Sequence, residues 1–112
     1  MIVERVETTV VDGRENEFEA ALCEVRQRVF MSKGFRGFTV AQGVERSSTY
    51  LIEVLWETLE ERADFERSGR FARCWTPVDP FLATPLRVEF FTPRPSLNLQ
   101  GPGVITDLSW TS

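Results

Sequence analysis

The run Thr49–Trp56 constrains the fold more than any other segment, because both faces of a strand formed there are apolar. Successive side chains of a strand point to opposite sides of its sheet. One side would carry Tyr50, Ile52, Val54 and Trp56, and the other would carry Leu51 and Leu55 on either side of Glu53. A strand with two apolar faces belongs to a sheet that is covered on both sides. The fold must therefore provide two covers for this sheet.

Two helices are predicted on either side of this run. The first begins with a capping-box pattern, in which Asp12 is followed by a glutamate three residues later, and it ends at Gly34. Its apolar residues recur at spacings of four, three and four, which form one stripe of a helix. The stripe consists of Phe18, Leu22, Val25 and Val29. The second helix begins with a similar pattern at Thr58 and stops near Gly69, and a short helical piece follows over residues 71–75.

Strands are predicted at residues 2–11, 35–44 and 85–92, in addition to residues 49–56. The order of elements is then β-α-β-β-α-β. This order is typical of a ferredoxin-like α+β fold, with a four-stranded antiparallel sheet and the helices on one face. We place this domain at residues 1–92.

The second cover of the sheet is predicted to come from another copy of the chain. Two helices cover only one face, and a symmetric contact between identical faces closes the other one. Burying this face is favourable at roughly 25 cal/mol per Å², whereas an exposed apolar patch invites aggregation. We therefore expect a homodimer with its two sheets face to face. In the alternative, the C-terminal segment folds back over that face and leaves a monomer.

Residues 93–112 form a separate C-terminal arm that is rich in turn residues. The arm also carries apolar side chains, namely Leu97, Leu99, Val104, Ile105, Leu108 and Trp110. Each is worth roughly 1.5–3 kcal/mol when fully buried. We expect the arm to dock on the partner subunit or over the mouth of a pocket. The alternative is a solvated extension.

The composition excludes several classes of function. The chain has no histidine, a formal net charge of −4 and a pI of about 4.9. Histidine is the commonest general base and metal ligand, and nucleic-acid binding needs a basic surface. A glycine-rich phosphate loop is also missing from the sequence. We expect no metal, haem or flavin cofactor and no nucleic-acid partner.

Two further expectations concern the cell compartment. Cys23 and Cys74 lie far apart without CxxC spacing, and we expect reduced core thiols rather than a disulfide. The N-terminal residues show no secretory signal pattern, and no apolar run approaches the roughly 20 residues of a membrane-spanning helix. We expect a cytoplasmic protein that does not enter a membrane.

The chain resembles the antibiotic biosynthesis monooxygenase family of dimeric α+β barrels over residues 2–92. The resemblance is carried by the segments DGRENEF (residues 12–18), GFRG (34–37) and YLIEVLWETLE (50–60). Its most specific part is Trp56, which ends a strand and is followed by an acidic helix and Phe65. The resemblance implies a pocket between sheet and helices in each subunit, and a barrel formed by two sheets at the dimer interface.

The resemblance also implies a class of chemistry. Cofactor-free members place a tryptophan in the pocket at the position of Trp56, and an asparagine four residues earlier, where this chain has Ile52. Haem-degrading members carry a histidine near the position of Trp75. We therefore expect a cofactor-independent monooxygenase-like enzyme that acts on a hydrophobic aromatic or polyketide-like molecule in secondary metabolism. The alternatives are a non-oxidative cyclase, isomerase or dehydratase that uses the same pocket, and a non-catalytic dimeric ligand-binding protein.

Four aromatic residues are predicted to bind the substrate, and the catalytic base stays unnamed. They are Trp56, Tyr50, Phe65 and Trp75. Trp56 would lie opposite Gly37 in the next strand, which would leave room for a pocket floor. The alternative for each residue is simple core packing, or a position at the sheet edge for Tyr50. Arg67, Arg70 and Arg73 are either solvated, or one of them holds a substrate oxyanion.

Overall fold

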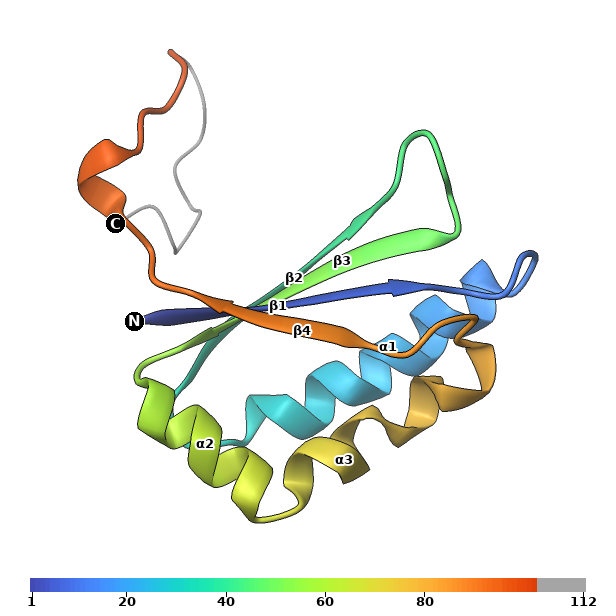
Figure 1. Ribbon diagram of the computed structural model, residues 1–112, viewed down its shortest axis with the longest axis horizontal. Coiled ribbons are helices and arrows are strands. Elements are labelled where there is room, and N and C mark those ends of the chain that lie inside the picture. The colour runs from blue at the N-terminus through green and yellow to red at the C-terminus, as the bar shows by residue number, and fades with distance from the viewer. Residues whose placement is uncertain (103–112) are drawn as a thin grey trace.

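The structure is a computed structural model that describes residues 1–102, and its architecture is the predicted ferredoxin-like α+β fold (Figure 1). The elements are β1 (Ile2–Thr9), α1 (Glu15–Phe30), β2 (Phe35–Gln42), β3 (Thr49–Trp56), α2 (Leu59–Arg67), α3 (Arg70–Trp75), the 3-10 helix η1 (Thr76–Phe81), β4 (Arg87–Phe91) and the 3-10 helix η2 (Pro95–Leu97). The strands form one antiparallel sheet in the order β2-β3-β1-β4.

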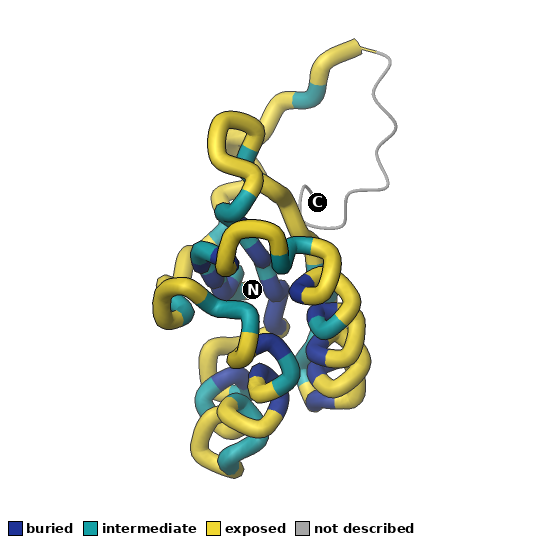
Figure 2. Tube along the Cα trace, turned by 90° about the vertical axis from the view of Figure 1, so that its right-hand side faces the viewer, coloured by how far each residue is buried: buried dark blue, intermediate teal, exposed yellow. Residues whose placement is uncertain are grey.

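All three α-helices lie on one face of the sheet (Figure 1). The stripe predicted for α1 is fully confirmed, since Phe18, Leu22, Val25 and Val29 are all buried. They pack against the inner face of β3, formed by Tyr50, Ile52, Val54 and Trp56, which is at most 3% exposed. The buried positions gather between the two layers (Figure 2). The cover of the opposite face by a second copy stays a prediction.

Of the two predicted helix N-caps, the one of α2 is confirmed and the one of α1 is wrong. Thr58 caps α2, because its Oγ1 accepts a hydrogen bond from the Glu61 N–H at 3.1 Å. The capping box predicted at Asp12 is wrong, since α1 is preceded by Arg14 and has no side-chain cap. The helix starts too late for Glu15 to occupy the third helical position that a capping box requires.

Gly34 lies in the turn between α1 and β2 and does not end the helix as predicted. α1 stops at Phe30, and Gly34 adopts a positive φ of 87° a few residues later. A Cβ atom there would clash with the Glu61 side chain of α2. Glycine therefore permits both the turn and the close approach of α2.

Several boundaries differ from the sequence predictions. The strands predicted at residues 2–11, 35–44 and 85–92 are each shorter in the structure. η1 was not predicted; its Val78 is completely buried. In the arm, Leu97 and Leu99 are 78% and 97% exposed in the single chain. The other apolar residues of the arm lie outside the described residues.

The two cysteines are free, as predicted, but they occupy different environments. Cys74 is buried and Cys23 is exposed, so the predicted core position is wrong for Cys23. Cys23 directly follows Leu22 on α1, and successive helical residues point about 100° apart. Its side chain therefore leaves the apolar stripe.

Within residues 1–102, every helix is too short or too polar to cross a bilayer.

Candidate functional site

A row of four aromatic side chains connects the end of β3 with α2 and α3. The ring centroids of Trp56 and Phe65 are 5.3 Å apart, those of Phe65 and Phe71 are 6.3 Å apart, and those of Phe71 and Trp75 are 6.5 Å apart. These distances are typical of packed aromatic pairs. We call Trp56, Phe65, Phe71 and Trp75 the aromatic row. It brings together three of the four predicted site residues.

The position of Trp56 in the sheet differs from the prediction. Its strand partner in β2 is Phe35, while Gly37 faces Leu55, because the pairing is irregular between Phe35 and Gly37. The Phe35 ring packs edge-on against Trp56, with centroids 6.5 Å apart. The space expected opposite Gly37 is therefore not available to Trp56.

Tyr50 lies at the opposite end of β3 from Trp56 and does not join the aromatic row. Its ring packs on Phe18 at a centroid distance of 4.7 Å, and its hydroxyl donates a hydrogen bond of 2.5 Å to a Glu19 carboxylate oxygen. Burial, and then the bond with Glu19, raise the pKa of Tyr50. The hydroxyl therefore stays protonated and engaged.

A wide cleft of about 600 Å³ adjoins Tyr50 at this end of the sheet. Most of its lining residues are polar or charged, among them Thr8, Gln42, Arg46, Thr84 and Arg87. None of the residues of the aromatic row lines it. The sequence-predicted site is therefore divided between two places, with Tyr50 at one and the other three residues at the second.

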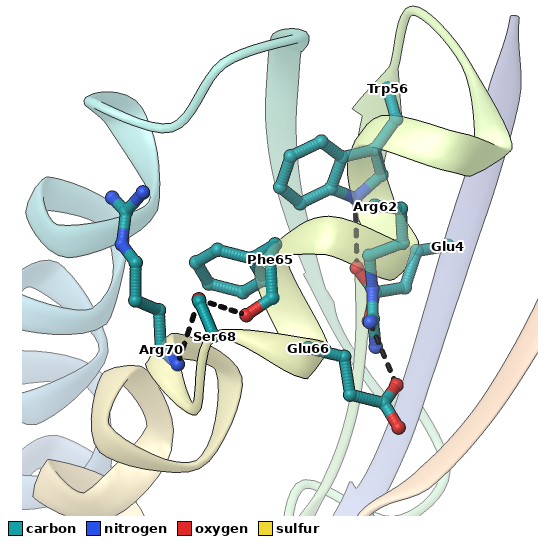
Figure 3. Close-up of polar contacts among 7 residues, drawn as sticks. All are labelled: Glu4, Trp56, Arg62, Phe65, Glu66, Ser68 and Arg70. Atoms are coloured by element: carbon teal, nitrogen blue, oxygen red, sulfur yellow. Dashed lines mark hydrogen bonds and ion pairs between the residues drawn. The ribbon is translucent and has the colours of Figure 1, made fainter.

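The indole of Trp56 is held by a buried carboxylate (Figure 3). Its Nε1–H donates to Glu4 Oε1 at 2.9 Å, and the guanidinium of Arg62 donates to Glu4 Oε2 at 2.8 Å. Glu4 and Arg62 are each 2% exposed, and Trp56 is completely buried. Both carboxylate oxygens of Glu4 are thus engaged by fixed donors.

Arg62 is surrounded by aromatic rings and a second carboxylate. Its guanidinium carbon lies 4.4 Å from the Phe71 ring centroid and 5.1 Å from that of Phe90. Burial disfavours its charge, but the hydrogen bonds with Glu4 and Glu66 outweigh burial and raise the pKa of Arg62. Its Nε has no hydrogen-bond partner among residues 1–102. Arg62 is therefore a charged group inside the apolar layer next to the aromatic row.

The sequence predictions missed Glu4 and Arg62, although a signal for each was present. Glu4 alternates with Ile2 and Val6, which places it on the inner face of β1. Arg62 stands three residues before Phe65 and so shares the buried side of α2. A charge on each of two facing apolar surfaces indicates a buried ion pair.

Phe65, although only 5% exposed, is the member of the aromatic row that lines two hollows. A cleft of about 230 Å³ lies between α1 and α3, lined by Arg28, Phe65, Arg70, Arg73 and Cys74. A second hollow of about 230 Å³ shares Phe65 and Arg70 and includes Ser32 and Ser68. We call the first of these the arginine cleft. Trp56 and Trp75 lie behind it and line neither hollow.

The thiol in the arginine cleft is not set up as a nucleophile. Burial raises the pKa of Cys74 to about 11, and its Sγ–H donates to the Val25 carbonyl at 3.5 Å. A reactive cysteine has a lowered pKa, which favours the thiolate. In the described part of the chain, no group of three or more cysteine and carboxylate side chains is placed to hold a metal ion.

A family model and a relative of known sequence both match most of this chain. A family model described as antibiotic biosynthesis monooxygenase matches residues 1–75. YczJ, an uncharacterized protein of Bacillus subtilis (strain 168), is 27% identical over 97 residues, which cover 87% of this chain and 94% of YczJ.

Two solved structures share the fold. One, from Bordetella bronchiseptica and named a candidate antibiotic biosynthesis monooxygenase, is 28% identical with a TM-score of 0.75, over 81% of this chain and 94% of that one. The other is SnoaB, a cofactor-independent oxygenase from Streptomyces nogalater, which is 17% identical with a TM-score of 0.71, over 83% of this chain and 92% of SnoaB.

Proposed function

Because the chain belongs to the antibiotic biosynthesis monooxygenase family, we propose that it is a cofactor-independent oxygenase of secondary metabolism with a hydrophobic aromatic or polyketide-like substrate. One observation carries the proposal, namely the aromatic row that runs from Trp56 to Phe65, where the Phe65 ring lines a cleft beside arginine side chains. Small-molecule sites are mostly apolar, with a few placed polar groups. SnoaB, a cofactor-independent oxygenase of the same fold, supports the reaction class.

Within this proposal, Phe65 offers its ring to the substrate, and Trp56 and Trp75 form the wall behind it. The indole N–H of Trp56 is already bonded to Glu4. Trp56 therefore acts through its apolar surface rather than as a hydrogen-bond donor. Tyr50 adjoins the separate cleft but is buried and bonded to Glu19, so we propose no contact between its hydroxyl and the substrate. A second copy of the chain would complete the surroundings of that cleft in a face-to-face homodimer.

The reaction needs a substrate that binds as its anion, such as an acidic phenol or enol. The anion transfers one electron to O2, the resulting radical and superoxide combine into a peroxide, and loss of water leaves a carbonyl. In sum, a ring CH2 and one O2 give a ring C=O and one H2O. The protein's part is to orient the anion, stabilise its charge and keep water away. A substrate that ionises in water near neutral pH requires no protein base.

Oxygen uptake tests the proposal. We expect anthrone, an enolisable tricyclic ketone, to consume O2 and form the corresponding quinone faster with the protein than with heat-unfolded protein. Phe65→Leu should slow the reaction by about tenfold, if it removes roughly 1.4 kcal/mol of binding to the transition state. Phe81→Leu is the matched control, because Phe81 packs on Arg14 outside the aromatic row.

The outcome also separates the alternatives. Conversion of an offered substrate without O2 uptake would identify a cyclase, isomerase or dehydratase. Binding without any conversion across a panel of phenols and enols would identify a ligand-binding protein. Equal rates with native and unfolded protein, for every member of such a panel, would refute the oxygenase proposal.

A further inference from the structure

The arginine cleft concentrates positive charge on an acidic protein. Three of its lining residues, Arg28, Arg70 and Arg73, are arginines, while the whole chain carries a net charge of −4. The arginines come from two elements, since Arg28 lies in the last turn of α1 and the other two lie in α3. Their meeting is thus a product of the fold and not of one charged segment.

Arg28 is fixed in place by α3. Its guanidinium donates to the backbone carbonyl of Arg73 at 2.6 Å, and it lies 3.5 Å from the exposed carboxylate of Glu24. The carbonyl bond ties the end of α1 to α3. Arg28 therefore forms one wall that is already ordered before any ligand binds.

Arg70 and Arg73 have no carboxylate within ion-pair distance among residues 1–102. Arg70 donates instead to the buried Ser32 hydroxyl at 3.1 Å, and its guanidinium carbon lies 5.5 Å from the Phe65 ring centroid. The partners of Arg70 are thus neutral groups that hold its position without balancing its charge. Arg67, by comparison, is paired with Asp64 and does not line the cleft.

The remaining lining of the cleft is apolar and uncharged. The Phe65 ring forms part of it, and the Cys74 thiol is protonated at neutral pH because burial raises its pKa to about 11. A space of about 230 Å³ accommodates a one- or two-ring molecule, or one end of a larger molecule. An aromatic surface under guanidinium groups suits a planar ring that carries an oxyanion, since arginine binds carboxylates with two parallel hydrogen bonds and also stacks on rings.

We propose that the arginine cleft binds the carboxylate of an aromatic acid, with the carboxylate at Arg70 and Arg73 and the ring against Phe65. This inference rests on the proposed function and deepens it, because it specifies that the substrate carries a carboxylate in addition to its reactive ring. The carboxylate would anchor the molecule at the Phe65 end of the aromatic row.

Binding of 2-naphthoate, measured by calorimetry or NMR titration, tests the inference without any turnover. We expect 2-naphthoate to bind and its neutral analogue 2-naphthamide to bind at least about tenfold more weakly, as expected for lost hydrogen bonds between charged groups. The double variant Arg70→Gln/Arg73→Gln should lose affinity for 2-naphthoate by at least the same factor. Arg26→Gln is the matched control, since Arg26 is exposed on α1 and does not line the cleft.

Three results would contradict the inference, and the combination of both assays separates it from the oxygenase proposal. Equal affinity for the acid and the amide, or no effect of the double variant with an unchanged melting temperature, would refute it. Inorganic phosphate that binds as tightly as 2-naphthoate would show a general anion site without recognition of the ring. If 2-naphthoate binds through the arginines and no member of the phenol and enol panel gives O2 uptake above that with unfolded protein, the oxygenase proposal fails and the anion site stands. If O2 uptake occurs and the acid does not bind, the reverse holds.

Discussion

Glu4→Gln is the substitution that best tests the buried ion pair beside Trp56. The change removes the carboxylate of Glu4 but keeps an oxygen that can accept the indole N–H of Trp56. Arg62, 2% exposed, would then keep only Glu66, whose own side chain is 64% exposed. Removing one partner of a buried ion pair costs about 3–5 kcal/mol. Because Glu66 still compensates part of the charge, we expect a loss near the lower end, about 3 kcal/mol.

A second variant tests whether the loss of stability in Glu4→Gln comes from the unpaired charge of Arg62. Glu4→Gln/Arg62→Met removes both charges and fills the space of Arg62 with a flexible apolar side chain. Replacing both partners of a buried pair by apolar or neutral groups is often neutral. We therefore expect the double variant to recover to within about 1 kcal/mol of the wild type, so that the two substitutions are strongly non-additive.

Urea unfolding followed by circular dichroism measures these differences, at one protein concentration for all variants because a dimer's stability depends on it. The control is Glu57→Gln, which breaks the 2.6 Å pair with Arg36, a pair whose side chains are 47% and 52% exposed. Exposed pairs contribute about 0–1 kcal/mol. If Glu4→Gln costs no more than Glu57→Gln, the argument that Glu4 compensates a buried charge is wrong.

Three further predictions concern Trp56, the two thiols and the C-terminal arm. Trp56→Phe leaves Glu4 Oε1 without its indole donor, so it should lower stability by about 1–3 kcal/mol; an unchanged melting temperature would contradict this. Ellman's reagent at pH 8 should modify exposed Cys23 rapidly and leave buried Cys74, with its pKa of about 11, protected until urea is added; two fast thiols in native protein would contradict it. Removing residues 96–112 should weaken the predicted homodimer in sedimentation equilibrium, and an unchanged dimer affinity would show that the arm is only a solvated extension.

The fold was predictable because its main signals are local and periodic. The stripe on α1, the two-faced run of β3 and the Thr58 cap each depend on spacings within a few residues. The missed features depend on contacts between distant segments. Gly34 is required by the Glu61 side chain of α2 as well as by its own turn, and the irregular pairing that places Phe35 opposite Trp56 depends on how two strands align.

The sequence predicted the aromatic residues of the candidate site, but it did not predict that they lie in two separate places. Aromatic residues in a sequence indicate apolar surface, and this signal grouped Trp56, Phe65 and Trp75, whose rings lie in one packed row. The separation of Tyr50 could have been predicted, because six residues of one strand at about 3.3 Å each place Tyr50 roughly 20 Å from Trp56.

Charged residues are harder to place from sequence, because most of them lie in water. Arg28 joins Arg70 and Arg73 only because its guanidinium bonds to a carbonyl of α3, a contact between segments far apart in the chain. Glu4 gives the more useful lesson, since a carboxylate on the inner face of a strand must have a partner, whatever the rest of the sequence suggests. A search for that partner on the apolar side of each helix would have led to Arg62, and from there to the surroundings of Trp56. Charges in apolar stripes are therefore the sequence feature that can carry prediction from a fold to its site.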